Sequence, residues 1–145
     1  MIANTTHRGK ATEAIILSIL TQLGKSVLIP WGEERYDLAI DDVGRLIRIQ
    51  CKTGVLRKGC VVFKTCITDA RRPQGDGGYA GQIDAFAVFC PELNTAYLVP
   101  IDALPSPFWG YLRVEPTLNG QTRCIRWARD FELRLPRMSI SANEP

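Results

Sequence analysis

Two short segments of alternating polarity, separated by a turn, are the feature that most restricts how this chain can fold. Apolar side chains alternate with polar or small ones in residues 36–41 and again in residues 45–52. Alternation with a period of two is typical of strands that bury one face. The intervening residues 42–44 end in glycine and favour a tight turn. The sequence therefore predicts a β-hairpin in this part of the chain.

Helical periodicity precedes the hairpin, and further strand-like runs follow it. Apolar residues three and four apart predict a helix over residues 6–23, and Gly24 favours its end. Short apolar or alternating runs predict strands over residues 27–29, 61–67, 83–90, 95–100, 109–114 and 123–127. Residues 101–104 and 130–133 favour single helical turns. This order predicts one α+β domain over residues 1–145, built around one mixed sheet, with 136–145 as a loose tail.

Composition indicates an ordinary globular domain in a reducing compartment. The 145 residues are 46% hydrophobic and 23% charged, and no apolar run approaches the ~20 residues that span a bilayer. The beginning of the chain has no signal-peptide pattern. Five cysteines without a Cys-x-x-Cys pair, and a single histidine, disfavour a structural zinc site and suit reduced thiols. We expect a protein of the cytoplasm, or of an organelle or nucleoid, that does not associate with membranes.

The charge balance is mildly basic and uneven. The chain has 18 Lys and Arg residues and 15 Asp and Glu residues, which gives a net charge of +3, and the basic excess lies in the first 72 residues. A basic region is compatible with a polyanionic partner such as nucleic acid, although many enzymes share this balance.

Four polar residues stand out because the predicted elements can bring them together. Gln50 and Lys52 project from one face of their strand, and Asp37 lies on the corresponding face of the preceding strand. Glu13 shares a helical stripe with apolar residues three, four and seven positions later. Burying that carboxylate unpaired would cost several kcal/mol, roughly, so a divalent metal that Asp37 also holds would stabilise it.

Each of these residues also has an ordinary structural explanation. Asp37 and Lys52 could form a cross-strand ion pair worth less than about 1 kcal/mol. Glu13 could be a surface charge at the edge of a wide apolar stripe, and Gln50 a solvated strand residue. From spacing alone, these ordinary explanations stay open for all four residues.

The pattern Glu13 … Asp37 … Gln50-Cys51-Lys52 resembles the PD-(D/E)xK nuclease superfamily. The segments GEERYDLAI, IRIQCKTG and GQIDAFAVFCPELNTAYLVP are similar to its group I intron-associated homing endonucleases. The resemblance extends over residues 10–100. It implies a restriction-endonuclease-like α+β core, in which a central mixed β-sheet lies beside an N-terminal helix that carries a metal-site carboxylate.

The resemblance also implies a function and roles for individual residues. It implies a Mg²⁺-dependent endonuclease that hydrolyses double-stranded DNA, a site-specific intron homing enzyme in which Mn²⁺ substitutes for Mg²⁺. Asp37 would be the central metal ligand, Glu13 a helix-borne ligand or orienting group, and Lys52 the motif lysine. Gln50, where the family usually has Asp or Glu, and the backbone carbonyl of Cys51 would complete the ligands. Because Gln50 removes one negative charge, we expect weaker metal affinity and one ion rather than two.

Other functions of the same fold stay open at this point. A Holliday-junction resolvase or a restriction-type endonuclease would use the same residues, and a catalytically inactive DNA-binding module could result from the change to Gln50. One small domain covers few base pairs, so we expect a homo-oligomer, either a dimer or a tetramer. The C-terminal third, with Trp109, Tyr111, Trp127 and Phe131, is the expected assembly surface.

Further side chains are weaker candidates for DNA contacts. They are basic, or they flank the glycine-rich residues 71–81, and each could equally be a solvated or paired surface side chain. They are Lys10, Arg48, Arg57, Lys58, Lys64, Arg71, Arg72, Tyr79 and Gln82.

Overall fold

A computed structural model describes residues 4–66 and 79–136. In this part of the chain one helix, α1 (Thr5–Gln22), precedes eight strands. The strands are β1 (Ser26–Leu28), β2 (Leu38–Asp42), β3 (Arg45–Thr53), β4 (Val55–Arg57), β5 (Cys60–Lys64), β6 (Ala85–Cys90), β7 (Thr95–Pro100) and β8 (Trp109–Arg113). Single 3₁₀ turns are η1 (Pro91–Leu93), η2 (Ile101–Ala103) and η3 (Ala128–Asp130).

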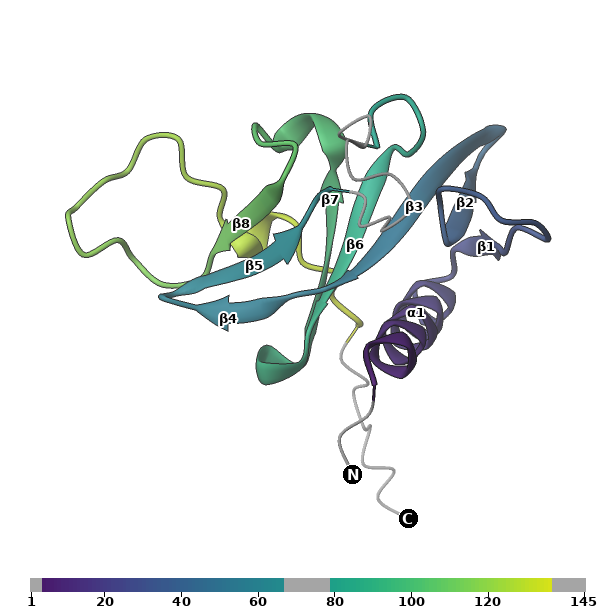
Figure 1. Ribbon diagram of the computed structural model, residues 1–145, viewed down its shortest axis with the longest axis horizontal. Coiled ribbons are helices and arrows are strands. Elements are labelled where there is room, and N and C mark those ends of the chain that lie inside the picture. Colours follow the sequence, from purple (N-terminus) through teal and green to yellow (C-terminus); the bar gives the residue numbers. More distant parts are fainter. Residues whose placement is uncertain (1–3, 67–78, 137–145) are drawn as a thin grey trace, which may run out of the picture.

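The strands form two sheets (Figure 1). The larger sheet has five strands in the order β1-β2-β3-β6-β7, and β3 and β6 run parallel while its other neighbours are antiparallel. The smaller, antiparallel sheet has the order β4-β5-β8. The predicted α+β class with a central mixed sheet is therefore confirmed.

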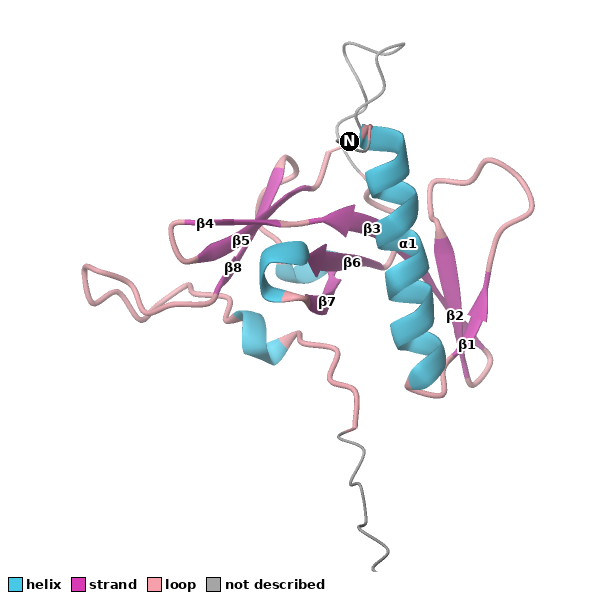
Figure 2. Cartoon of the chain, turned by 90° about the horizontal axis from the view of Figure 1, so that it is seen from below, coloured by secondary structure: helices cyan, strands magenta, loops and turns pink. Residues whose placement is uncertain are grey.

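The large sheet is covered on both faces. Helix α1 buries Ile16 and Leu20 against one face, and the small sheet packs against the other, as Figures 1 and 2 show. Strand β6 is buried along its whole length because it lies between the two layers. Its side chains alternate between the two cores: Phe86 and Val88 face the small sheet, and Phe89 faces the helix.

The predicted hairpin forms between β2 and β3. Leu38 pairs with Ile49 and Asp42 with Arg45, and the two turn residues, Val43 and Gly44, both have positive φ. Two positive φ values in a two-residue turn match the right-handed twist of the strands. Asp37 lies immediately before β2 rather than inside the strand, which the alternation had extended to residues 36–41.

The chain passes from the large sheet to the small one at Gly54, between β3 and β4. The Gly54 backbone nitrogen donates to the Phe89 carbonyl oxygen at 2.8 Å, so Gly54 still pairs with strand β6 of the large sheet. A Cβ at this position would lie 2.6 Å from Cγ1 of Val61 and 3.0 Å from Cγ1 of Val88. Glycine is needed here because the two sheets converge on its backbone.

Several sequence expectations are wrong. The strands form two sheets rather than one, and β4 was not expected because it is only three residues long and follows a glycine. Residues 123–127 are not a strand; only Trp127 bridges to Arg113, and the helical turn lies at Ala128–Asp130 rather than at 130–133. Arg71, Arg72 and nearly all of the predicted tail lie outside the described residues. Within the described ranges, no helix is both long and apolar enough to cross a membrane.

Candidate active site

A cavity of about 390 Å³ opens between the first turns of α1 and the end of β3. In Figure 2 the beginning of α1 lies beside the arrowhead of β3. The cavity is lined by the five residues of the predicted site, which are Glu13, Asp37, Gln50, Cys51 and Lys52. Its other lining residues are Thr5, Arg8, Gly9, Thr12 and Thr53. The fold thus brings a helical acid, the acid that precedes β2 and three consecutive residues of β3 around one space.

Asp37 is held at the cavity by the hairpin backbone. Its backbone nitrogen donates to the Ile49 carbonyl oxygen at 2.8 Å, and its Oδ2 accepts from the Cys51 backbone nitrogen at 2.9 Å. Among the described residues no group donates to Oδ1. Burial raises the pKa of the Asp37 carboxyl above its ordinary value, the Cys51 N–H opposes this, and the nearby Glu13 charge raises the pKa further.

Glu13 is positioned by a contact between the helix and β3. Thr12, its neighbour, places Oγ1 2.6 Å from Oγ1 of Thr53, and both hydroxyls lie at the cavity. The Glu13 side chain is 28% exposed, and its Oε2 accepts from Lys10 Nζ at 3.1 Å. Lys10 is itself 74% exposed, so this pair is open to competition from solvent and from other anions.

Lys52 does not form the simple ion pair with Asp37 that the hairpin alone allowed. Its Nζ donates to the Tyr79 hydroxyl at 3.2 Å and lies 5.0 Å from the centroid of the Tyr79 ring. No carboxylate of the described residues lies within ion-pair distance of this ammonium. Burial lowers the pKa of Lys52, because the charged form loses solvation. Tyr79 therefore supports the lysine directly.

Arg48 is engaged in a structural contact. Its Nε lies 3.2 Å from Oδ2 of Asp84, and its NH1 donates to the Gly81 carbonyl oxygen at 3.1 Å. The hydrogen bonds from Arg48 hold the pKa of Asp84 below its ordinary value. This pair joins the strands β3 and β6 where they begin to run parallel, so its main observed role is in the fold.

The remaining basic candidates do not gather at one point. Arg57 and Lys58 lie at the β4–β5 turn, whereas Lys64 is at the opposite end of β5. Gln82 lies in the turn before β6, where its backbone nitrogen donates to the Tyr79 carbonyl oxygen at 2.9 Å. A DNA contact by any of these side chains stays a prediction.

Sequence reasoning missed the helical residues that line the cavity ahead of Glu13. Thr5, Gly9 and Glu13 are four residues apart, and so are Arg8 and Thr12, which places them on adjoining stripes of α1. That spacing is visible in the sequence and could have identified them. The Thr12–Thr53 and Lys52–Tyr79 contacts have no comparable local signal.

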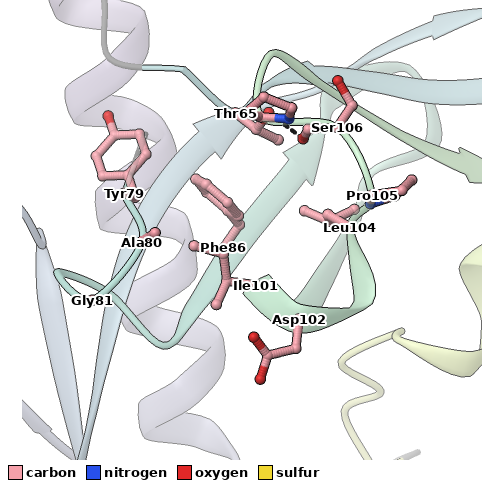
Figure 3. Close-up of a pocket in the computed structure, with 11 residues that line it drawn as sticks. Thr65, Tyr79, Ala80, Gly81, Phe86, Ile101, Asp102, Leu104, Pro105 and Ser106 are labelled. Carbon is pink, nitrogen blue, oxygen red and sulfur yellow. Dashed lines mark hydrogen bonds between the residues drawn. The ribbon is translucent and has the colours of Figure 1, made fainter. Parts of the chain in front are cut away.

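A second cavity, of about 440 Å³, lies behind Tyr79 and has a different character. Figure 3 shows its lining, in which Phe86, Ile101 and Leu104 contribute apolar side chains. Asp102 is the only charged side chain among the described residues that line it. This lining does not suit a phosphodiester, so the first cavity is the better candidate for chemistry.

The first cavity is lined by residues with oxygen ligands and by a half-buried cation. Glu13, Asp37 and Gln50 are among its lining residues, and the hard oxygen donors that such side chains carry suit Mg²⁺ or a similar divalent ion. Burial and the nearby charge of Glu13 both raise the pKa of Asp37, and a bound cation would favour its ionised form. Within residues 4–66 and 79–136 no three His, Cys, Asp or Glu side chains meet at one point, and Gln50, which lines the cavity together with the two acids, is uncharged.

Comparisons with known proteins agree with this fold. A solved structure described as a bacterial homing endonuclease, I-Ssp6803I, superposes with a TM-score of 0.64 at 20% sequence identity, covering 91% of this chain and 88% of the other. That similarity shows a shared fold. No curated protein matches the sequence. The family model for PD-(D/E)XK endonucleases matches residues 3–134, which is nearly the whole chain. The chain therefore belongs to the PD-(D/E)XK endonuclease family.

Proposed function

We propose that this chain is a Mg²⁺-dependent endonuclease that hydrolyses phosphodiester bonds of double-stranded DNA at the Glu13–Lys52 cavity. The observation that carries the proposal is that two acids, a glutamine and a half-buried lysine line one cavity. An ordinary ion pair or a solvated strand would not require these groups to be held together at a cavity. Their spacing in the sequence and the family match support the same conclusion.

We propose that Asp37, Glu13, the Gln50 amide oxygen and the Cys51 carbonyl hold the metal. Oδ1 of Asp37, to which no described residue donates, and the all-oxygen donor set fit a hard divalent cation. When bound, the ion would act as a Lewis acid and lower the pKa of water. Because Gln50 contributes no charge, we expect one ion, weakly held, with Mn²⁺ able to substitute for Mg²⁺.

Lys52 would act on the substrate at its Nζ. An ammonium beside the scissile group stabilises the negative charge that develops on the phosphoryl oxygens. Its lowered pKa also suits a proton transfer with the attacking water, since a shift towards neutrality brings a lysine nearer the working pH. The Tyr79 hydroxyl accepts from Nζ at 3.2 Å and would orient it.

A glycine on the helical side of the cavity supports the proposal that a DNA backbone can enter it. Gly9 lies inside α1, where glycine is less favourable than alanine by roughly 0.5–1 kcal/mol. Apart from its chain neighbours and the backbone of its own helix, a Cβ on Gly9 would meet no described atom within 4 Å, so packing against the described residues does not explain the glycine. We infer that Gly9 leaves room for a phosphodiester, with Arg8 of the cavity lining and the exposed Lys10 next to Gly9 in the sequence to contact phosphates.

The finer assignment is a site-specific intron homing enzyme that acts as a homo-oligomer. One domain of this size covers few base pairs, and symmetric copies extend the contacted site. The described surface offers apolar side chains beside the edge strand β1, where Leu28, Ile29 and Trp31 are exposed. Sedimentation in solution tests the expected dimer or tetramer, and a purely monomeric protein on and off DNA would contradict it.

A cleavage assay tests the proposal and its rivals together. The substrate is a library of random duplexes, titrated with Mg²⁺ and Mn²⁺, with binding measured in parallel. We expect Asp37→Ala and Lys52→Ala to abolish cleavage and retain binding. Asp42→Ala, which removes an exposed acid at the far end of β2 and outside the cavity, is the matched control and should cut normally.

Three results would change the assignment. Cleavage by Asp37→Ala at the rate of the unmodified protein would refute the active site. Binding without metal-dependent cutting by the unmodified protein would indicate an inactive DNA-binding module. Preferential cleavage of four-way junctions over linear duplex would indicate a junction resolvase.

A further inference from the structure

The outer face of the small sheet carries basic and aromatic side chains that the active site does not use. The cross-strand register pairs Arg57 with Cys60, Cys60 with Arg113, and Lys64 with Trp109. Leu56, Val61, Phe63 and Leu112 of these strands pack into the core, so alternation places the remaining residues on the outer face. This outer face consists of Val55, Arg57, Cys60, Val62, Lys64, Trp109, Tyr111 and Arg113.

Three of these eight residues are cations and none is acidic. The Lys64 ammonium lies 5.6 Å from the centroid of the Trp109 ring, and Arg113 NH1 donates to the Lys58 carbonyl oxygen at 3.0 Å. Trp109 is 39% and Tyr111 54% exposed. The acid Glu115 lies beyond the end of β8, beside Gly59 of the β4–β5 turn. The face therefore combines positive charge with exposed aromatic rings.

This charge pattern favours a polyanion over a second copy of the chain. A two-fold interface brings the same patch of each copy together, and here it would place like charges against each other. Phosphates instead match the cations, and exposed aromatic rings contribute contacts to sugars or bases. The expected assembly role of Trp109 and Tyr111 is therefore the less favoured use of this face.

We propose that this outer face binds the DNA backbone on one side of the cut; the proposal rests on the proposed nuclease function. The face and the active site belong to one stretch of chain, because β3 continues through Gly54 into β4 (Figure 1). Lys52 and Arg57 are five residues apart, which is at most about 17 Å of extended chain. At about 3.4 Å per base pair, the contacted phosphates lie within roughly five base pairs of the scissile bond.

The test is the salt dependence of DNA binding by an Arg57→Gln/Lys64→Gln double variant. Binding to a random duplex of about three helical turns is followed by fluorescence anisotropy without divalent metal, so that nothing is cut. Losing two phosphate contacts should reduce the slope of log affinity against log salt by about 1.8. Over a fourfold rise in salt, the double variant should then lose about 12-fold less affinity than the unmodified protein. Lys25→Gln, at the far end of α1, is the matched control and should keep the original slope.

An unchanged slope in the double variant would overturn the proposal. Tyr111→Ala gives an independent readout: we expect weaker DNA binding and unchanged sedimentation. Altered sedimentation with unchanged DNA affinity would instead identify the face as an interface between copies. Cleavage is measured in a separate assay. If the double variant shows the expected smaller salt slope but the unmodified protein does not cleave DNA, the nuclease function is refuted while the assignment of this face to DNA binding stands.

Discussion

Substituting Gly54 by alanine tests the junction that links the active-site strand to the small sheet. The new methyl carbon would lie 2.6 Å from Cγ1 of Val61 and 3.0 Å from Cγ1 of Val88. Carbon atoms normally approach to about 3.5–4.0 Å, so one wall must move by about 1 Å. Both valines are fully buried, and overpacking of such a core costs about 1–3 kcal/mol.

We expect Gly54→Ala to lower the midpoint of thermal unfolding by roughly 2–12 °C, at about 2–4 °C for each kcal/mol in a domain of this size. Gly54 is two residues from Lys52, so cleavage should also fall in the fraction that stays folded. Urea unfolding measures the free-energy change. Gly9→Ala is the control for stability and should not lower the midpoint, because its methyl group meets no described atom outside its own helix backbone and chain neighbours.

A double-mutant cycle shows whether the clash itself is the cause. Val61→Ala removes the side chain that the new methyl group would meet, so adding it to Gly54→Ala should cost less than the sum of the single changes. We expect a favourable coupling of about 0.5–3 kcal/mol, the range for residues in contact. Simple additivity, or an unaltered unfolding midpoint in Gly54→Ala, would refute the packing explanation.

Three further changes address the site itself. In metal-free protein, Asp37→Asn should raise the free energy of unfolding at pH 7, because burial raises the pKa of Asp37 and disfavours its ionised form. Urea titrations should show that this gain vanishes well below pH 3.8, where the acid is protonated in both the folded and the unfolded state. An equal gain at both pH values would contradict this explanation. Gln50→Glu should keep cleavage and lower the Mg²⁺ concentration for half-maximal rate, since it restores a negative ligand; loss of cleavage would argue against Gln50 as a ligand. Gly9→Ala should stabilise the fold by about 0.5–1 kcal/mol and still slow cleavage of duplex DNA. Undiminished cleavage by Gly9→Ala would show that the DNA backbone does not occupy the space beside Gly9.

The sequence was most informative where its signals are local. The helix and the hairpin have strong periodicity, and hairpin register alone brings Asp37 beside Gln50. The division into two sheets has no such signal, because β4 is short and the change of direction rests on one glycine. Contacts such as Lys52–Tyr79 join residues 27 positions apart and depend on how the layers pack. The roles of the cavity residues remain a proposal that the variants above test.

The hydroxyl contact between Thr12 and Thr53 has a consequence for how accurately the two halves of the site meet. Each threonine is the immediate chain neighbour of a proposed working group, Glu13 on the helix and Lys52 on the strand. Apolar packing between a helix and a sheet tolerates small sliding movements, whereas a hydrogen bond of 2.6 Å weakens steeply when its atoms separate. The alignment of Glu13 with Lys52 across the two layers is thus set by the hydrogen bond between Thr12 and Thr53. Thermal motion that opens this hydrogen bond would separate the acid from the amine even while the apolar core stays intact.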